Sequence, residues 1–171
     1  GIDRLALALN ERYGRLDVLV GNAGVLGVLS PLGHVEPKVW DEAIAVNVTA
    51  NWRLIRSMDS LLQASTAGRA VFITSGAAHK ARAYWGVYAV SKAALEMLAC
   101  TYAAENEKTG VRVNLVNPGP IRTRMRAAAM PGEDASKLDA PAQVAAEIVK
   151  LCRPDFDQNG GLYDYPSRSM L

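Results

Sequence analysis

Short apolar runs alternate along the chain with longer stretches whose apolar residues recur every three or four positions. The short runs lie within 16–24, 69–78 and 110–119, and each is followed by Asn, Ser or Gly. This pattern is typical of a buried parallel strand that leads into a turn. After the turn signal Gly160-Gly161, residues 162–165 form a shorter candidate strand. The sequence therefore predicts a sheet of about four strands.

The longer stretches are predicted to be helices, over 2–13, 36–65, 88–108 and 140–152. Asp3 is a candidate cap for the first helix, and Gly14 is its stop signal. Gly110 is the stop signal of the third helix, and Pro141 lies near the first position of the fourth. The polar segment 120–140 is predicted to be a mobile flap that contains a short helix.

Strands that alternate with helices at this spacing predict a doubly wound parallel sheet of the α/β class, with helices on both faces. A length of 171 residues suits one domain with a substantial core. We therefore expect 1–171 to form a single domain.

Composition favours a soluble protein, and the cytoplasm is its expected location. Lys plus Arg number 19 and Asp plus Glu number 17, an excess of only two positive charges. The arginines at 122, 124 and 126 alternate along the chain instead of forming a sustained basic face, so nucleic acid is not an expected partner. No apolar stretch is long enough to cross a membrane, so a membrane is not an expected partner either.

Cysteine and histidine residues show no metal-ligand spacing, so no metal site is predicted. Cys100 and Cys152 are expected to be buried small hydrophobic residues in a reducing compartment. His34 and His79 are expected to lie in loops.

Polar and small residues follow each of the three main predicted strands, as Asn22-Ala23-Gly24, Ser75-Gly76 and Asn117-Pro118-Gly119. Because ligands bind at the carboxyl ends of parallel strands, these segments are candidates for one shared site. Taken alone, each also has a structural interpretation: Asn-Ala-Gly as a turn, and Ser75 as a helix cap. Asn47, on the inner stripe of its helix, is either a functional residue or a satisfied structural asparagine.

Tyr88 and Lys92 stand four residues apart on a predicted helix and so share one face. A nearby cation favours the phenolate, which would bring the pKa of the tyrosine toward the working pH of a proton-transfer catalyst. Asn-Ala-Gly, Asn47, Ser75, Tyr-x-x-x-Lys and Asn-Pro-Gly-Pro-Ile-Arg-Thr occur in one order and register. Together they resemble the short-chain dehydrogenase/reductase family of the classical type, from Leu16 to the last strand.

The resemblance implies a catalytic role for four residues. Tyr88 resembles the general acid/base of the family, and Lys92 the lysine that holds the nicotinamide ribose and lowers the pKa of the tyrosine. Ser75 resembles the serine that hydrogen-bonds the substrate oxygen. Asn47 matches the asparagine that anchors a proton-relay water.

The resemblance also implies a cofactor, NAD or NADP, and the segments that bind it. With Tyr88 and Lys92, the matching residues are Asn22, Ala23, Gly24, Pro118, Gly119, Ile121 and Thr123. Gly21 departs from the family pattern, which has a second Asn there, and this departure is expected to matter little. Residues 124–140 match the substrate-side flap, and 78–86, with Tyr84 and Trp85, are expected to line the substrate pocket.

The glycine-rich phosphate-binding turn of the family has no counterpart in the chain. We therefore expect the chain to form the C-terminal portion of a Rossmann-like sheet, either as a true fragment or as part of a longer enzyme. The expected function is hydride transfer between nicotinamide and a small-molecule carbonyl or secondary alcohol. The alternative is a non-catalytic fragment or family member that acts in assembly or binding.

The family resemblance also implies a homodimer or homotetramer. The candidate contact residues on the helices are Trp52, Met58, Met97 and Tyr102, for which core packing is an equally good explanation.

Overall fold

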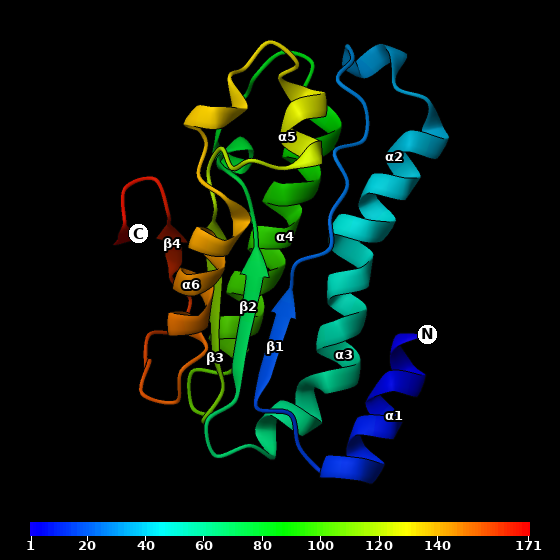
Figure 1. The fold of residues 1–171 in the computed structure, drawn as a ribbon. Coiled ribbons are helices and arrows are strands. Elements are labelled where there is room, and N and C mark those ends of the chain that lie inside the picture. Colours follow the sequence, from blue (N-terminus) through cyan, green and yellow to red (C-terminus); the bar gives the residue numbers. More distant parts are fainter.

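A computed structural model describes residues 1–171 and confirms the α/β architecture (Figure 1). One sheet has the strand order β1-β2-β3-β4-β5. The strands are β1 (Val18–Gly21), β2 (Arg69–Ile73), β3 (Arg112–Asn117), β4 (Leu162–Asp164) and β5 (Ser169–Met170). The first four are parallel, and β5 runs antiparallel to β4. The prediction of about four strands missed β5, because two residues in a polar segment carry no strand pattern.

The predicted helices are also present. They are α1 (Ile2–Tyr13), α2 (Pro37–Ile44), α3 (Ala50–Gln63), α4 (Gly86–Glu105), α5 (Arg124–Ala129) and α6 (Pro141–Leu151). The helix predicted over 36–65 is continuous except that a π-helical turn, η2 (Ala45–Thr49), joins α2 to α3. Short 3-10 helices are η1 (Leu32–His34), η3 (Gly76–His79) and η4 (Ala135–Lys137).

Two helix ends differ from their predicted signals. Asp3 does not cap α1; its carboxylate accepts a hydrogen bond from Ser57 Oγ at 2.6 Å and so ties α1 to α3. Helix α4 ends at Glu105 instead of Lys108, because the Asn106 side chain donates back to Tyr102 O at 3.0 Å. The other signals hold: Gly14 ends α1 in the left-handed conformation, and Pro141 is the first residue of α6.

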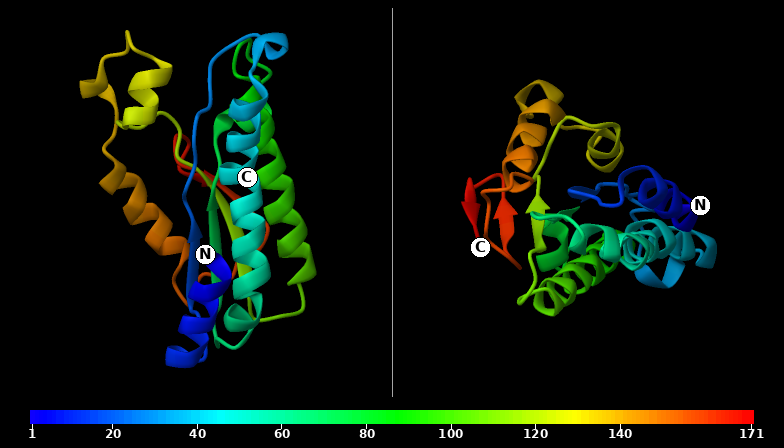
Figure 2. Two further views of the ribbon diagram at one scale, coloured as in Figure 1. Left: turned by 90° about the vertical axis from the view of Figure 1, so that its right-hand side faces the viewer. Right: turned by 90° about the horizontal axis from the view of Figure 1, so that it is seen from below.

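Side chains of the central strands alternate between two apolar layers. Phe72 and Leu115 point into the larger core, beneath α1, α3 and α4. Val71, Ile73 and Val116 point to the opposite face, where Leu151 of α6 covers them. Figure 2 shows α6 on the other side of the sheet from α3 and α4. Helices therefore cover both faces, as predicted.

The burial of the two cysteines differs from the prediction for one of them. Cys100 is exposed on α4, whereas Cys152 is partly buried, so only the second resembles the predicted buried cysteine. Met58 and Tyr102 belong to the core, whereas Trp52 and Met97 are exposed. None of the helices combines the length and the apolarity that spanning a membrane requires.

The carboxyl ends of the parallel strands meet at the edge of the sheet that lies beneath α5 (Figure 1). Asn117 ties these ends together. Its Oδ1 accepts from the backbone N–H groups of Gly76 at 2.9 Å and Gly119 at 3.1 Å, and its Nδ2 donates to Asp164 at 2.6 Å. One side chain thus fixes the turns that follow β2, β3 and β4.

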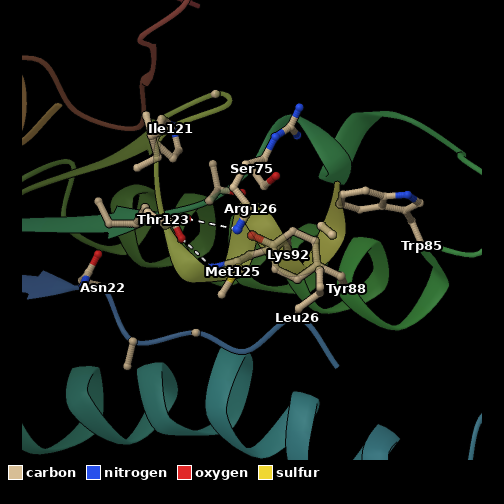
Figure 3. A pocket seen from close by; sticks show the side chains of 17 residues that line it. Asn22, Leu26, Ser75, Trp85, Tyr88, Lys92, Ile121, Thr123, Met125 and Arg126 are labelled. Atoms are coloured by element: carbon tan, nitrogen blue, oxygen red, sulfur yellow. Dashed lines mark hydrogen bonds between the residues drawn. The ribbon is translucent and has the colours of Figure 1, made fainter. Parts of the chain in front are cut away.

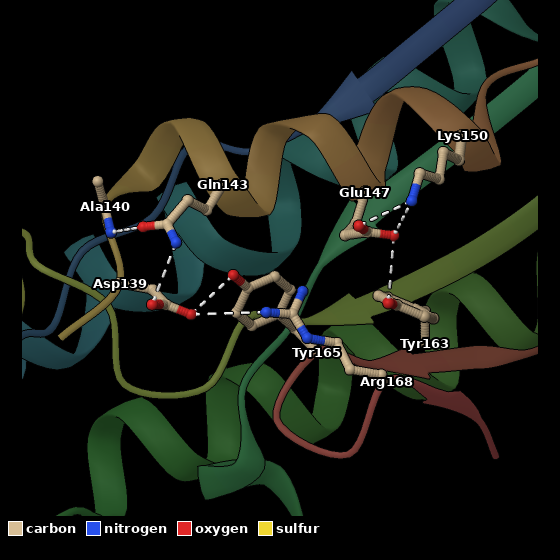
Figure 4. A network of polar contacts seen from close by, with 8 residues as sticks. All are labelled: Asp139, Ala140, Gln143, Glu147, Lys150, Tyr163, Tyr165 and Arg168. Atoms are coloured by element: carbon tan, nitrogen blue, oxygen red, sulfur yellow. Dashed lines mark hydrogen bonds and ion pairs between the residues drawn. The ribbon is translucent and has the colours of Figure 1, made fainter.

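The predicted flap is held at its base. Ile121 and Asp139 form a parallel bridge, and the Asp139 carboxylate accepts from Tyr165 Oη at 2.8 Å and pairs with Arg168 at 3.6 Å. Figure 4 shows this network beside the start of α6, where Gln143 reaches back to the N–H of Ala140. The flap therefore enters and leaves the fold at a fixed point, and its mobility stays a prediction.

Packing at the end of β1 predicts the effect of a single added methyl group. A Cβ at Gly21 would overlap Asn51 Oδ1 and the ring of Phe72, which are both buried. We expect Gly21→Ala to lower the free energy of unfolding by about 1–3 kcal/mol, since overpacking forces buried neighbours apart. Gly132→Ala is the control, because nothing lies within 4 Å of the added atom. Urea denaturation curves of equal stability for both variants would contradict this packing.

Candidate active site

A cavity of about 430 Å³ opens at the carboxyl edge of the sheet, between the loops after β1, β2 and β3 and the helices α4 and α5. It brings together all the residues predicted for catalysis and cofactor binding except Asn47. These are Asn22, Ala23, Gly24, Ser75, Tyr88, Lys92, Pro118, Gly119, Ile121 and Thr123. Figure 3 shows Ser75, Tyr88 and Lys92 near one another, with Trp85 beyond the tyrosine.

Helix α4 positions Tyr88 and Lys92 in its first turns, where the helix packs against the sheet. The Lys92 side chain is 3% exposed, and its Nζ donates a hydrogen bond to the carbonyl of Ile73 at 2.7 Å. The same nitrogen lies 5.8 Å from the centre of the Tyr88 ring. The ammonium therefore faces the end of β2 and the face of the ring.

Burial dominates the protonation of both groups. It lowers the pKa of Lys92 to about 8, against a smaller opposing effect of the Glu96 carboxylate. It also raises the pKa of Tyr88, although the Ser75 side chain acts in the other direction. Burial of the phenol therefore sets the direction of the shift, and the expected lowering of the tyrosine pKa by Lys92 stays a prediction. At neutral pH Tyr88 is a phenol and Lys92 is mostly an ammonium.

Ser75 serves as a helix cap and also faces the cavity. Its Oγ accepts a hydrogen bond from the N–H of Ala77 at 3.2 Å, at the start of η3. A hydroxyl that accepts in this way still has its own proton to donate. Ser75 is thus oriented by the backbone and able to donate a hydrogen bond toward a ligand in the cavity.

Asn47 is fully buried in the π turn and does not line the cavity. Its Oδ1 accepts from Val25 N at 2.8 Å, and its Nδ2 donates to Val25 O at 2.9 Å and to Ser91 Oγ at 2.8 Å. This uses both donors of the amide. Of the two interpretations, a satisfied structural asparagine describes the side chain. The Asn47 backbone carbonyl accepts a hydrogen bond from Asn51 Nδ2 at 2.9 Å, and the predicted role of anchoring a water stays a prediction.

Gly24 lies close to both of these residues. A Cβ there would stand 3.4 Å from Asn47 Oδ1 and 3.4 Å from Lys92 Nζ. The loop therefore passes close to the lysine, and an added Cβ would be in ordinary van der Waals contact with it. The Lys92 ammonium, a hydrogen-bond donor that lines the cavity, is chemically suited to the ribose hydroxyl groups of a dinucleotide.

Sequence reasoning missed a polar chain behind Lys92. Thr74 Oγ1 donates to Glu96 at 2.6 Å, and His79 Nε2 lies 2.9 Å from the other oxygen of that carboxylate. The four-residue spacing of Lys92 and Glu96 was an available signal, but the approach of His79 depends on tertiary structure. Tyr84, expected in the pocket, is exposed and does not line this cavity, whereas Trp85 lines it.

Comparison with known proteins relates the chain to one family. Residues 1–134 match the sequence profile of the short chain dehydrogenase family. The chain is 39% identical over 159 residues to the uncharacterised oxidoreductase YciK of Escherichia coli, which covers 93% of this chain and 63% of YciK. It is 40% identical over 116 residues to an uncharacterised NAD-dependent oxidoreductase of Mycobacterium tuberculosis, covering 67% of the chain and 42% of that protein. The chain thus spans less than two thirds of these relatives.

Solved structures show the same similarity in three dimensions. A short chain dehydrogenase from Escherichia coli CFT073, in complex with NADPH, superimposes with a TM-score of 0.91 at 38% sequence identity. The superposition covers 96% of this chain and 68% of that one.

The buried ammonium of Lys92 predicts a specific pH dependence of stability. Its pKa is about 8 when folded and 10.5 when free, so between these values the unfolded state binds more protons and stability rises with pH. From pH 7 to pH 10 the wild type should gain about 2.5 kcal/mol relative to Lys92→Met. Urea denaturation at both pH values measures the difference.

Lys137→Met removes an exposed lysine and is the matched control. It should follow the wild type at both pH values. If Lys92→Met also runs parallel to the wild type, the ammonium is not held in the buried state described above.

Proposed function

The chain belongs to the short chain dehydrogenase family, and from this we propose that the whole protein is an NAD(P)-dependent oxidoreductase. In this proposal it interconverts a small-molecule carbonyl compound and a secondary alcohol. The observation that carries the proposal is the single cavity that Ser75, Tyr88 and Lys92 line together with the loops 22–24 and 118–123. A hydrogen-bond donor, a proton donor and a buried cation there face one small space.

The four polar residues divide the work. Ser75 donates a hydrogen bond to the substrate oxygen and fixes its position. Tyr88 transfers a proton to that oxygen as negative charge develops, or removes it in the reverse direction. Lys92 supplies positive charge beside the ring and hydrogen-bond donors to the ribose. Asn47 is a positioning residue, because its side chain holds the loop that carries Gly24.

Protonation favours reduction at neutral pH. The raised pKa of Tyr88 keeps the phenol protonated, which is the state that can donate to an alkoxide. Oxidation requires the phenolate and should therefore need a higher pH.

NAD or NADP is the cofactor in this proposal. When bound, its nicotinamide supplies or accepts the hydride. Gly24 and Lys92 would hold the ribose, and the segment Pro118–Thr123 the carboxamide. Among the relatives, one is named NAD-dependent and another was solved with NADPH, so both cofactors stay candidates. Residues 124–140 would cover the substrate, and closure of this flap would exclude water.

The alternative function, assembly or binding without catalysis, is separated from this one by cofactor binding. Titration of NADH or NADPH fluorescence with the whole protein should show saturable binding, and its absence would favour the alternative.

For the proposed homodimer or homotetramer, the available helix residues are Trp52 and Met97, which are 46% and 68% exposed. Sedimentation of the whole protein as a monomer would contradict such an assembly.

Replacing the proton donor tests the catalytic proposal. We expect Tyr88→Phe to lower kcat/KM for carbonyl reduction by at least about a hundredfold, because general acid catalysis contributes on this scale. Binding of NAD(P)H should be unchanged. Tyr84→Phe is the control, since it removes a phenol only four residues away that is exposed and outside the cavity. Equal turnover of the two variants would refute the role of Tyr88.

A further inference from the structure

A second cavity, of about 420 Å³, adjoins the first on the side of the loop after β2. The two cavities share Ser75, Trp85 and Arg126 among their lining residues. A molecule whose oxygen lies at Ser75 therefore has the second cavity as the direct continuation of its binding space. The size of the pair exceeds what a single carbonyl group and its nearest carbons would fill.

The second cavity is lined by basic side chains. Lys80 and Arg82 come from the segment between η3 and α4, and Arg126 comes from α5. The one carboxylate in the lining, Asp164, accepts from Ser167 Oγ at 2.6 Å and from Asn117 Nδ2 at 2.6 Å and keeps its negative charge. These bonds also hold the pKa of Asp164 below its usual range.

Lys80 and Arg82 have no acidic partner within ion-pair distance, whereas Arg126 is held bidentately by Glu133. Both side chains are exposed at the wall of the cavity, where the one ionised carboxylate that faces them is Asp164. Because the Arg126–Glu133 pair is neutral, two cations against one carboxylate leave a net positive charge in this wall, which attracts anions.

Arg82 is also connected to the proposed proton donor. Its guanidinium stacks 5.3 Å from the centre of the Trp85 ring, and Trp85 meets the Tyr88 ring edge-on with centroids 6.2 Å apart. The intervening Tyr84 has a φ of 73°, a left-handed conformation that is strained for a bulky residue. This strained turn places Arg82 and Trp85 on the same wall. Strain of this kind is typical of ligand-binding segments.

We propose that the substrate carries an anionic oxygen group, a carboxylate or a phosphate, that binds Lys80 and Arg82 while its reacting oxygen lies at Ser75. This inference rests on the proposed function for the reaction, but the anion site itself is independent of turnover. Lys80 and Arg82 are then specificity-determining residues. They act on substrate affinity and not on the proton transfer.

Matched aldehydes test the anion site by binding alone. Calorimetric titration of the whole protein compares 4-carboxybenzaldehyde with its neutral methyl ester, methyl 4-formylbenzoate. We expect the carboxylate to bind about tenfold more tightly, and this preference to shrink as salt rises from 0.05 to about 0.5 M. 4-Formylphenyl phosphate in a third titration shows which anion is preferred.

The double variant Lys80→Gln/Arg82→Gln should bind acid and ester equally. Arg4→Gln/Lys108→Gln removes two exposed positive charges that line neither cavity and lie outside the flap, and it should keep the preference. In turnover assays with NAD(P)H, the first double variant should raise KM for the acid about tenfold and leave kcat within about twofold. Circular dichroism confirms that both variants fold.

Equal binding of acid and ester by the wild type, or an unchanged preference in Lys80→Gln/Arg82→Gln, would overturn the inference. Failure of the proposed function gives a different result: the charge preference in binding persists, while no aldehyde is reduced or Tyr88→Phe reduces them normally.

Discussion

The candidate site depends on the amide of Asn47. This side chain hydrogen-bonds both backbone groups of Val25 and the hydroxyl of Ser91, so it joins the loop after β1 to the first turns of α4. Loss of such a buried polar contact costs about 1–3 kcal/mol for each group left unsatisfied. The consequence is also geometric, because the same loop places Gly24 where an added Cβ would contact Lys92 Nζ. The π turn around Asn47 lets one residue of a long helix turn its amide toward another element.

The burial that orders Lys92 and Tyr88 also opposes their charges. Both side chains pack against the sheet, and desolvation shifts both pKa values toward the neutral forms. Lys92 nevertheless keeps most of its charge at neutral pH because the Ile73 carbonyl and the Glu96 carboxylate support it. A phenol beside a mostly charged lysine is the starting state for proton donation. In the proposed reduction, Tyr88 would therefore donate its proton from the state in which burial holds it.

Local patterns predicted the parts of the fold that depend on local forces. The apolar runs of β2 and β3, the stop at Gly14 and the Pro141 start of α6 each express backbone or periodic preferences. The predictions that failed depended on contacts between distant segments. Asp3 meets Ser57 instead of capping its own helix, and β5 exists only because the turn after β4 returns the chain.

The candidate site shows the same division. The motifs identified ten residues that line one cavity. Their positions could be predicted because these motifs lie at the ends of strands or in the first turns of a helix, which the topology fixes. The direction of the Tyr88 pKa could not be predicted, because it depends on how much of the phenol is desolvated. Nor could the partners of Glu96, since His79 reaches it from another element.

The two walls of the cavity differ in how they are built. Ser75, Tyr88 and Lys92 stand at a strand end and on a long helix, and Asn117 fixes the adjoining turns by three hydrogen bonds. Irregular or short elements carry the other wall, which consists of Lys80, Arg82 and the segment 122–138. The segment 122–138 is anchored at its base, where Ile121 pairs with Asp139 and Asp139 with Arg168. Rigid elements hold reacting groups to tenths of an ångström, whereas loops tolerate changes in length and charge. Substitution of a few side chains in the wall that holds Lys80 and Arg82 can therefore change the preferred substrate. The positions of the hydroxyl, the phenol and the ammonium stay the same.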